Sequence, residues 1–137
     1  MPETKTLIPQ TTAGLMRLSQ AIAKREGFGL AGTVPTRLNN PGDLIYAHQH
    51  DALPHGVTGR DGKLRVYAAF PSVMDGWLAL YNQIRLDAGR GLTLRAFIAK
   101  YAPASDDNDP ASYLQFVMRF THCQDPETKL SDLISLD

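Results

Sequence analysis

A long segment rich in turn-forming residues, residues 33–63, most constrains how this chain can fold. It is rich in Pro, Gly, Asn, Asp and His, and segments of helical periodicity lie on both sides of it. A connection of this length without structure of its own is uncommon in a small domain unless it is functional. Two strand-like patterns shorten it, residues 43–46 and residues 64–70, the second after a Gly59-Arg60-Asp61-Gly62 turn. We therefore expect a small β-hairpin or a three-stranded sheet here.

The residues before this segment follow a helical period. From Thr12 onward, Leu15, Leu18, Ile22 and Glu26 succeed one another at spacings of three, four and four. At 100° per residue they share one face, which we expect to pack against the core. Glycines at positions 27, 29 and 32 then end the helix.

The C-terminal half predicts four more helices, each from a start signal followed by an apolar stripe. The signals and stripes are Ser72 with Val73, Trp77, Leu80 and Ile84, ending near Gly89; Thr93 with Leu94, Phe97, Ile98 and Tyr101, stopped by Pro103; Asp109-Pro110 with Tyr113, Phe116, Val117 and Phe120; and Asp125-Pro126 with Leu130, Leu133 and Ile134. The predicted fold class is α+β, mainly helical, with one helix, a small antiparallel sheet and then a helical lobe.

Composition limits the class of protein. The 137 residues suit one domain, residues 12–137, behind a loose arm, residues 1–11. Equal numbers of basic and acidic residues, 14 each, argue against a general nucleic-acid binder. No apolar run reaches the ~18 residues of a membrane span, and one cysteine excludes an internal disulfide. We expect a monomer without membrane insertion.

Glu26 is the first candidate for chemistry. It lies at the C-terminal end of the predicted helix, on the stripe that faces the core. Burial and the negative end of the helix dipole should both raise its pKa. A carboxyl that keeps its proton near neutral pH can protonate a glycosidic oxygen. The alternative is a solvated glutamate at a frayed helix end, paired with Lys24 or Arg25.

The segment from Arg37 through Asn39, Asn40 and Asp43 to Leu44 is the second candidate. Its short hydrogen-bonding side chains beside a turn are typical of sugar-binding clefts, which read hydroxyls and N-acetyl groups. The alternative is an Asn-Pro-Gly-Asp turn with Asx capping and no further role.

These residues, taken together, resemble a group of phage, prophage and bacterial proteins of the lysozyme-like superfamily. In that group a Glu-Gly helix end precedes an Asn-Asn-Pro-Gly-Asn/Asp-Ile/Leu loop, as Glu26-Gly27 precedes residues 39–44 here. The resemblance covers residues 20–122 in order and continues through Phe70, Asp75-Gly76-Trp77, Leu92-Thr93-Leu94, Tyr101-Ala102-Pro103, Asn108 and Tyr113. The chain departs from the group at residues 104–108, where Pro and Glu are usual.

The resemblance implies cleavage of the β-1,4 bond between N-acetylmuramic acid and N-acetylglucosamine in peptidoglycan, with Glu26 as general acid. It implies no cofactor and no metal. The small sheet would form one wall of the sugar cleft and the C-terminal helices the other. The implied substrate-binding residues are Arg37, Asn39, Asn40, Tyr46, Phe70, Tyr101, Asn108 and Tyr113. For both tyrosines, a plain core role is the alternative.

Asp43 decides between two reactions. An inverting hydrolase needs a second carboxylate as base, with room for a water between the two carboxyls. Asp43 is the only acidic residue in the right loop, but the group also accepts asparagine there. With Glu26 alone, the 6-hydroxyl of the substrate can act as nucleophile and give a 1,6-anhydro product. The sequence slightly favours this lytic transglycosylase route over the lysozyme type.

Other clusters and functions carry less weight. His48, His50 and His55 with Asp51 suggest a zinc site but lack ordered flanks. Residues 106–109 suggest a calcium loop but lack its glycine and glutamate. The main rival function is a non-catalytic peptidoglycan-binding or virion structural protein that keeps the fold. Residues 1–10 have no apolar signal region. We therefore expect cytoplasmic synthesis, and access to the wall or periplasm through lysis, virion delivery or specialised secretion.

Overall fold

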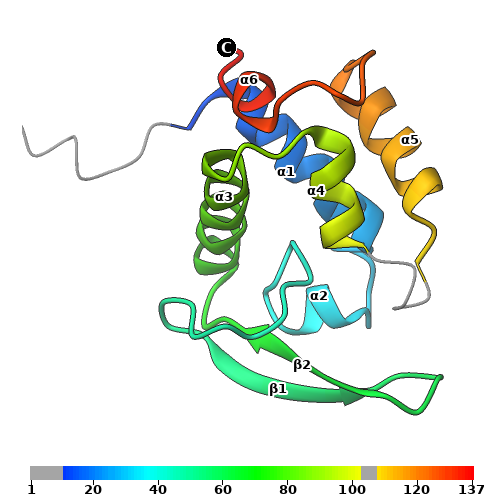
Figure 1. Cartoon of the computed structure of the whole chain (residues 1–137). Coiled ribbons are helices and arrows are strands. Elements are labelled where there is room, and N and C mark those ends of the chain that lie inside the picture. Colours follow the sequence, from blue (N-terminus) through cyan, green and yellow to red (C-terminus); the bar gives the residue numbers. More distant parts are fainter. Residues whose placement is uncertain (1–10, 103–107) are drawn as a thin grey trace, which may run out of the picture.

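The computed structural model describes residues 11–102 and 108–137. Its elements are α1 (Ala13–Glu26), α2 (Val34–Arg37), β1 (Leu53–Thr58), β2 (Leu64–Ala69), α3 (Val73–Gly89), α4 (Leu94–Tyr101), α5 (Pro110–Thr121) and α6 (Leu130–Ile134). About half of the chain is helical, and β1 and β2 form a two-stranded antiparallel sheet. The α+β class is therefore confirmed. Helix α1 packs among α3, α5 and α6, while the hairpin and α2 lie together at one end (Figure 1).

The predicted caps of three helices are confirmed, and Thr12, where the first helical pattern begins, caps α1 in the same way. Thr12, Ser72, Thr93 and Asp109 each accept a hydrogen bond from the backbone N–H three residues later. Such a bond satisfies one of the free donors of a first helical turn. At the other end of α1, Gly27 adopts the left-handed conformation, with φ of 88°. A glycine ends a helix this way without a Cβ penalty.

The last predicted helix start is wrong. Helix α6 begins at Leu130, and the Asp125-Pro126 pair lies in a turn before it. The backbone N–H groups of Leu94 and Arg95 donate to the carbonyls of Thr128 and Pro126. The segment thus forms a turn beside the start of α4, and the carbonyls of Pro126 and Thr128 are not available for a helical turn. The predicted stop at Pro103 lies outside the described residues, as do residues 1–10 of the predicted arm.

The sheet differs from the expectation in one strand. Residues 64–70 form β2 nearly as predicted, whereas the predicted strand at residues 43–46 contributes a single bridge, Ile45 to Tyr67. Backbone bonds from Tyr46 N to Val66 O and from Ala68 N to Leu44 O extend this contact. Strand β1, Leu53–Thr58, pairs with the other edge of β2 and was not predicted. The loop after α2 is therefore fixed against the sheet.

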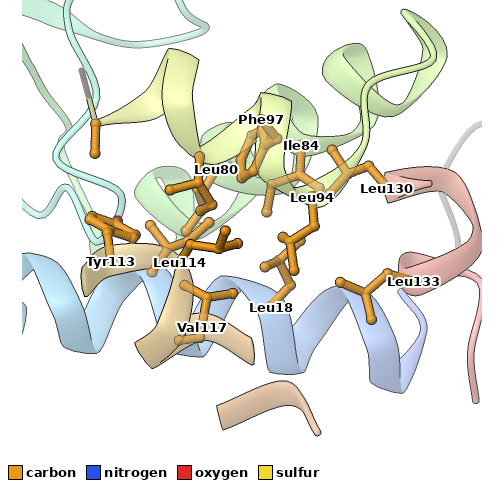
Figure 2. Packing of buried hydrophobic residues seen from close by; sticks show 14 of the residues in the cluster. Leu18, Leu80, Ile84, Leu94, Phe97, Tyr113, Leu114, Val117, Leu130 and Leu133 are labelled. Carbon is orange, nitrogen blue, oxygen red and sulfur yellow. The ribbon is translucent and has the colours of Figure 1, made fainter. Parts of the chain in front are cut away.

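The core lies between α1 and the four later helices (Figure 2). The predicted stripe of α1 is confirmed, because Leu15, Leu18 and Ile22 are at most 1% exposed. Each fully buried side chain of this kind contributes roughly 1.5–3 kcal/mol to folding. The stripe of α3 is confirmed at Leu80 and Ile84 but not at Val73, which is 40% exposed.

Candidate functional site

Four of the predicted site residues meet at one place, although they come from four separate parts of the chain. Glu26 ends α1, Asp43 lies in the loop after α2, Tyr101 ends α4, and Tyr113 lies in the first turns of α5. The Tyr113 hydroxyl donates to Glu26 Oε2 over 2.8 Å, and the Glu26 and Asp43 carboxyls share a hydrogen bond. The Tyr101 hydroxyl donates to the Gly42 carbonyl, next to Asp43. The rings of Tyr101 and Tyr113 lie 6.4 Å apart.

Glu26 is half-buried at a capped helix end, which contradicts the alternative of a solvated residue at a frayed end. Burial raises the pKa of its carboxyl, against the hydrogen bonds from Tyr113 and Asp43 and the charge of Arg25, which lower it. The Arg25 guanidinium lies over the Tyr113 ring, 5.4 Å from its centre. The expected direction of the Glu26 pKa shift is therefore confirmed, with burial as its main cause.

Asp43 lies in an environment that disfavours its charged carboxylate, and its backbone conformation is unusual for a non-glycine residue. Burial raises its pKa to about 8, and the negative charge and hydrogen bond of Glu26 raise it as well. Its backbone has φ of 52°, a left-handed conformation that non-glycine residues seldom adopt. Its Oδ1 atom is buried without a hydrogen-bond donor among the described residues. Strain and unpaired buried groups of this kind are concentrated at functional sites.

Asn40 fixes the loop that carries Asp43. Its side chain is fully buried and makes three hydrogen bonds: Nδ2 donates to Leu44 O and Ala68 O, and Oδ1 accepts from Leu44 N. All of these bonds go to the protein backbone. The predicted contact between Asn40 and substrate is therefore corrected: this side chain is not accessible, and it positions the loop.

Two glycines allow the surrounding helices to approach this loop closely. A Cβ at Gly76, in the first turn of α3, would lie 2.0 Å from the Asn39 carbonyl oxygen. A Cβ at Gly42 would lie 2.7 Å from the Tyr101 hydroxyl. No larger residue fits at Gly76 without a shift of the backbone. The Asp75-Gly76-Trp77 motif thus brings α3 against the Asn-Asn-Pro-Gly loop.

The remaining predicted site residues make contacts of other kinds or lie in the core. Phe70 is 5% exposed and belongs to the core, so its predicted substrate contact is corrected. Asn39 Nδ2 donates to the Phe70 carbonyl, and the exposed Arg37 donates from Nε to the Gly32 carbonyl; their contacts with substrate stay predictions. The Tyr46 hydroxyl pairs with His48 Nδ1 over 3.0 Å. Asn108 is exposed, one residue before the cap of α5.

A concave surface adjoins Asp43. A pocket of about 240 Å³ is lined by Asp43, Leu44, Ile45, Ala47, Gln83, Lys100 and Tyr101. A second pocket, of about 470 Å³, shares Ala47 and Gln83 with it and continues along α3 past Leu78 and Asn82 to Leu86. The two pockets have Ala47 and Gln83 in common, and we call the second one, which lies along α3, the α3 groove. Gln83 and Lys100 were not among the predicted site residues.

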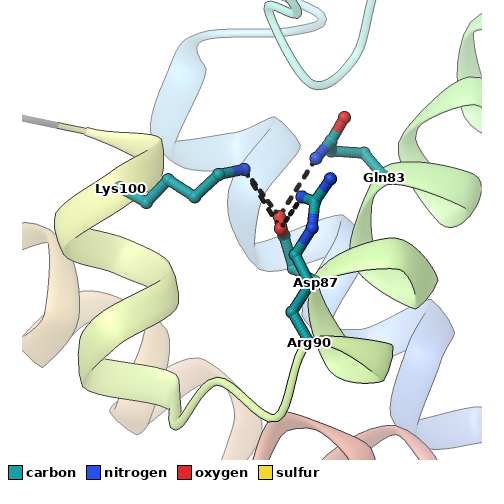
Figure 3. A network of polar contacts seen from close by, with 4 residues as sticks. All are labelled: Gln83, Asp87, Arg90 and Lys100. Carbon is teal, nitrogen blue, oxygen red and sulfur yellow. Dashed lines mark hydrogen bonds and ion pairs between the residues drawn. The ribbon is translucent and has the colours of Figure 1, made fainter.

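Gln83 and Lys100 belong to a buried ionic network around Asp87 (Figure 3). The fully buried Asp87 of α3 accepts hydrogen bonds from Gln83 over 3.0 Å, Arg90 over 2.7 Å and Lys100 over 3.0 and 3.1 Å. Burial alone would raise the pKa of Asp87, but these bonds together lower it. The network joins α3 to α4 beside the pocket. In the sequence, Gln83 and Asp87 lie one turn apart on α3, and Arg90 is the residue that caps its C-terminal end.

The described residues contain no cluster of three His, Cys, Asp or Glu side chains that could hold a metal ion, and this includes the His48, His50 and His55 loop. The calcium-loop interpretation falls partly on residues 106 and 107, outside the described residues. Within the described part of the chain, no helix is long and apolar enough to cross a membrane.

No protein-family model, curated protein or solved structure matches this chain. The functional argument below therefore rests on the site itself and on the sequence motifs that converge there.

Proposed function

We propose that this chain is a peptidoglycan glycosidase of lysozyme-like architecture, with Glu26 as its general acid. It would cleave the β-1,4 bond between N-acetylmuramic acid and N-acetylglucosamine. The observation that carries the proposal is the half-buried pair of Glu26 and Asp43 carboxyls with raised pKa values, of which Asp43 lines a pocket next to the α3 groove. Acid catalysis of glycoside cleavage needs a carboxyl whose pKa is raised in this way.

The α3 groove supports a polymeric substrate. It offers amide side chains, Gln49, Asn82 and Gln83, above apolar surface from Leu78 and Leu86. Amides recognise hydroxyl and N-acetyl groups, and apolar surface packs against sugar faces or acyl groups. Tyr101 closes the pocket on the side of the helical lobe, as the sequence analysis expected for a cleft wall.

The spacing of the two carboxyls favours transglycosylation over inversion. An inverting enzyme holds its carboxyls about 6.5–9.5 Å apart so that a water fits between them, and a retaining one about 5–5.5 Å apart. Here the Glu26 and Asp43 carboxyls interact through a hydrogen bond, so they lie closer together than the carboxyls of an inverting pair. Glu26 would instead protonate the leaving oxygen as the C1–O4 bond breaks. The 6-hydroxyl of the muramic acid would then attack C1 and return its proton to the carboxylate.

Mass spectrometry of digested peptidoglycan tests the proposal. We expect 1,6-anhydro-muropeptides from the wild-type protein and none from Glu26→Gln, whose amide cannot donate the proton. Glu127→Gln is the matched control. Glu127 is an exposed glutamate that forms an ion pair with Arg95, and it lies far from Glu26 in the sequence. Products with a free reducing end would indicate hydrolysis instead. Binding to the wall without any product would favour the non-catalytic alternative.

A further inference from the structure

We propose that Asp43 and Glu26 act as one acid–base unit that holds a single proton, with Asp43 as its resting carrier. This inference rests on the proposed function for its catalytic part, and its structural part stands independently. Asp43 then acts through Glu26, as a positioning residue that supplies the proton which Glu26 delivers to the substrate.

The hydrogen bonds place the negative charge on Glu26. Two carboxylates repel each other, and a hydrogen bond between them requires a proton on one of the pair. Glu26 accepts a second hydrogen bond from the Tyr113 hydroxyl, which stabilises its anionic form. The buried Oδ1 of Asp43 has no such donor among the described residues. The protonated carboxyl is therefore Asp43, which donates to Glu26.

The other charged and titratable groups around the pair do not change this assignment. Arg25 of α1 lowers the pKa of Glu26, which again favours charge on that residue. Burial raises the pKa of both Tyr101 and Tyr113, so they stay neutral donors. Lys100 of α4 is bound to the buried Asp87 of α3. Each neighbouring element therefore either favours the anion on Glu26 or contributes no free charge.

The backbone of Asp43 points to the same conclusion. Asparagine adopts the left-handed conformation at least as readily as aspartate and would avoid both the repulsion from Glu26 and the burial of a carboxyl. The structural cost of an aspartate here has no compensating ion pair in the described part of the chain. Asp43 also lines the pocket beside the pair. A role in proton supply accounts for this costly placement.

The proton balance closes within the pair. In the resting state the proton is on Asp43 and Glu26 is an anion. As the substrate binds, the Asp43 O–H bond breaks and a Glu26 O–H bond forms along the shared hydrogen bond. Glu26 then passes the proton to O4 as the C1–O4 bond breaks, and the proton of the attacking 6-hydroxyl restores the starting state.

A carboxyl ¹³C NMR titration of the full-length chain tests the resting state without any assay of activity. We expect the Asp43 side chain to titrate with a midpoint near pH 8. Asp51 is the matched position for a control substitution, because it also has a left-handed backbone, with φ of 61°, but is exposed. An Asp43 midpoint near pH 4 would overturn the inference.

The pH profile of peptidoglycan cleavage tests the catalytic part. In Asp43→Asn no shared proton remains, and the asparagine amide can donate to Glu26. We therefore expect the alkaline limb of the profile to move down by at least one pH unit, while Asp51→Asn leaves it in place. An unchanged profile in Asp43→Asn would contradict the proton-supply role. A wild-type protein that cleaves nothing, yet shows the raised Asp43 midpoint, would refute the proposed function and uphold the shared proton.

Discussion

Tyr113 donates a hydrogen bond to Glu26 over 2.8 Å and thereby joins α5 to the end of α1 at the candidate site. The two residues are separated by 87 positions in the sequence. Tyr113 is 2% exposed, and the rest of its ring packs in the core. Tyr113 is therefore part of the core and also stabilises the anionic form of Glu26, the candidate acid.

Tyr113→Phe should raise the pKa of Glu26, because it removes a hydrogen bond that lowers this pKa. The free energy of unfolding should fall by about 0.5–1.5 kcal/mol, the net value of one such bond. The alkaline limb of the activity profile should move to higher pH, and the rate should fall about tenfold. Tyr81→Phe is the control, with a tyrosine ring packed near Trp77 and away from the carboxyl pair. Equal pH profiles in the two variants would contradict the role of Tyr113.

Asp43→Asn should stabilise the fold at alkaline pH. The folded-state pKa of Asp43, about 8, is raised above its unfolded value of 3.8. For a raised pKa, the stabilising contribution is present below pH 4 and is lost as the pH rises towards 8. Asparagine removes this loss, so at pH 9 the variant should melt at least roughly 3 °C higher than the wild type, which corresponds to about 1 kcal/mol. Thermal unfolding at pH 5 and pH 9 measures the difference, and a gain that is equal at both values would argue against titration of Asp43.

Asn40→Ala should be among the most destabilising polar substitutions in the chain. It leaves the Ala68 carbonyl and the Leu44 N–H without the partners that Asn40 provides, while the Leu44 carbonyl keeps the Ala68 N–H as a donor. We expect a loss of about 2–4 kcal/mol, since each unsatisfied buried group costs about 1–3 kcal/mol. Chemical denaturation measures it, with the exposed Asn82→Ala as control. A loss under 0.5 kcal/mol would show that water replaces the amide and that the loop does not depend on it.

Asp87→Asn should lower the free energy of unfolding and loosen the packing of α3 against α4 beside the pocket. The substitution leaves Lys100 and Arg90 without the buried carboxylate and should cost about 3 kcal/mol. Because the folded-state pKa of Asp87 is lowered, its contribution is present above the unfolded pKa of 3.8 and is lost as the pH falls through the folded value. The difference between wild type and variant should therefore shrink below pH 4. Asp61→Asn, at an exposed pair with Arg65, should change the melting temperature little.

Local signals in the sequence predicted most of the helices because those signals act within a few residues. Thr12, Ser72, Thr93 and Asp109 cap helices as their residue types require. The Asp125-Pro126 signal failed because that segment satisfies its carbonyls on Leu94 and Arg95, more than 30 residues away in the sequence. Strand β1 escaped prediction because Pro54 and Gly56 are poor strand formers, and only its pairing with β2 fixes it.

The two acidic residues of the candidate site could be predicted from the sequence, but the contacts that support them could not. Glu26 stood out by its place on a helical stripe, and Asp43 by its loop. Asn40 was assigned to substrate because an exposed and a buried asparagine look alike in a sequence, whereas its three backbone bonds need the folded loop. The sequence does not indicate that Asp87 is buried, because its partner Lys100 lies on another helix.

The most direct test of the account is mass spectrometry of peptidoglycan digested by the wild-type chain, by Glu26→Gln and by Glu127→Gln. The account predicts 1,6-anhydro-muropeptides from the wild type and from Glu127→Gln, and none from a folded Glu26→Gln. Equal product yields from Glu26→Gln and the wild type would contradict the claim that this carboxyl delivers the proton.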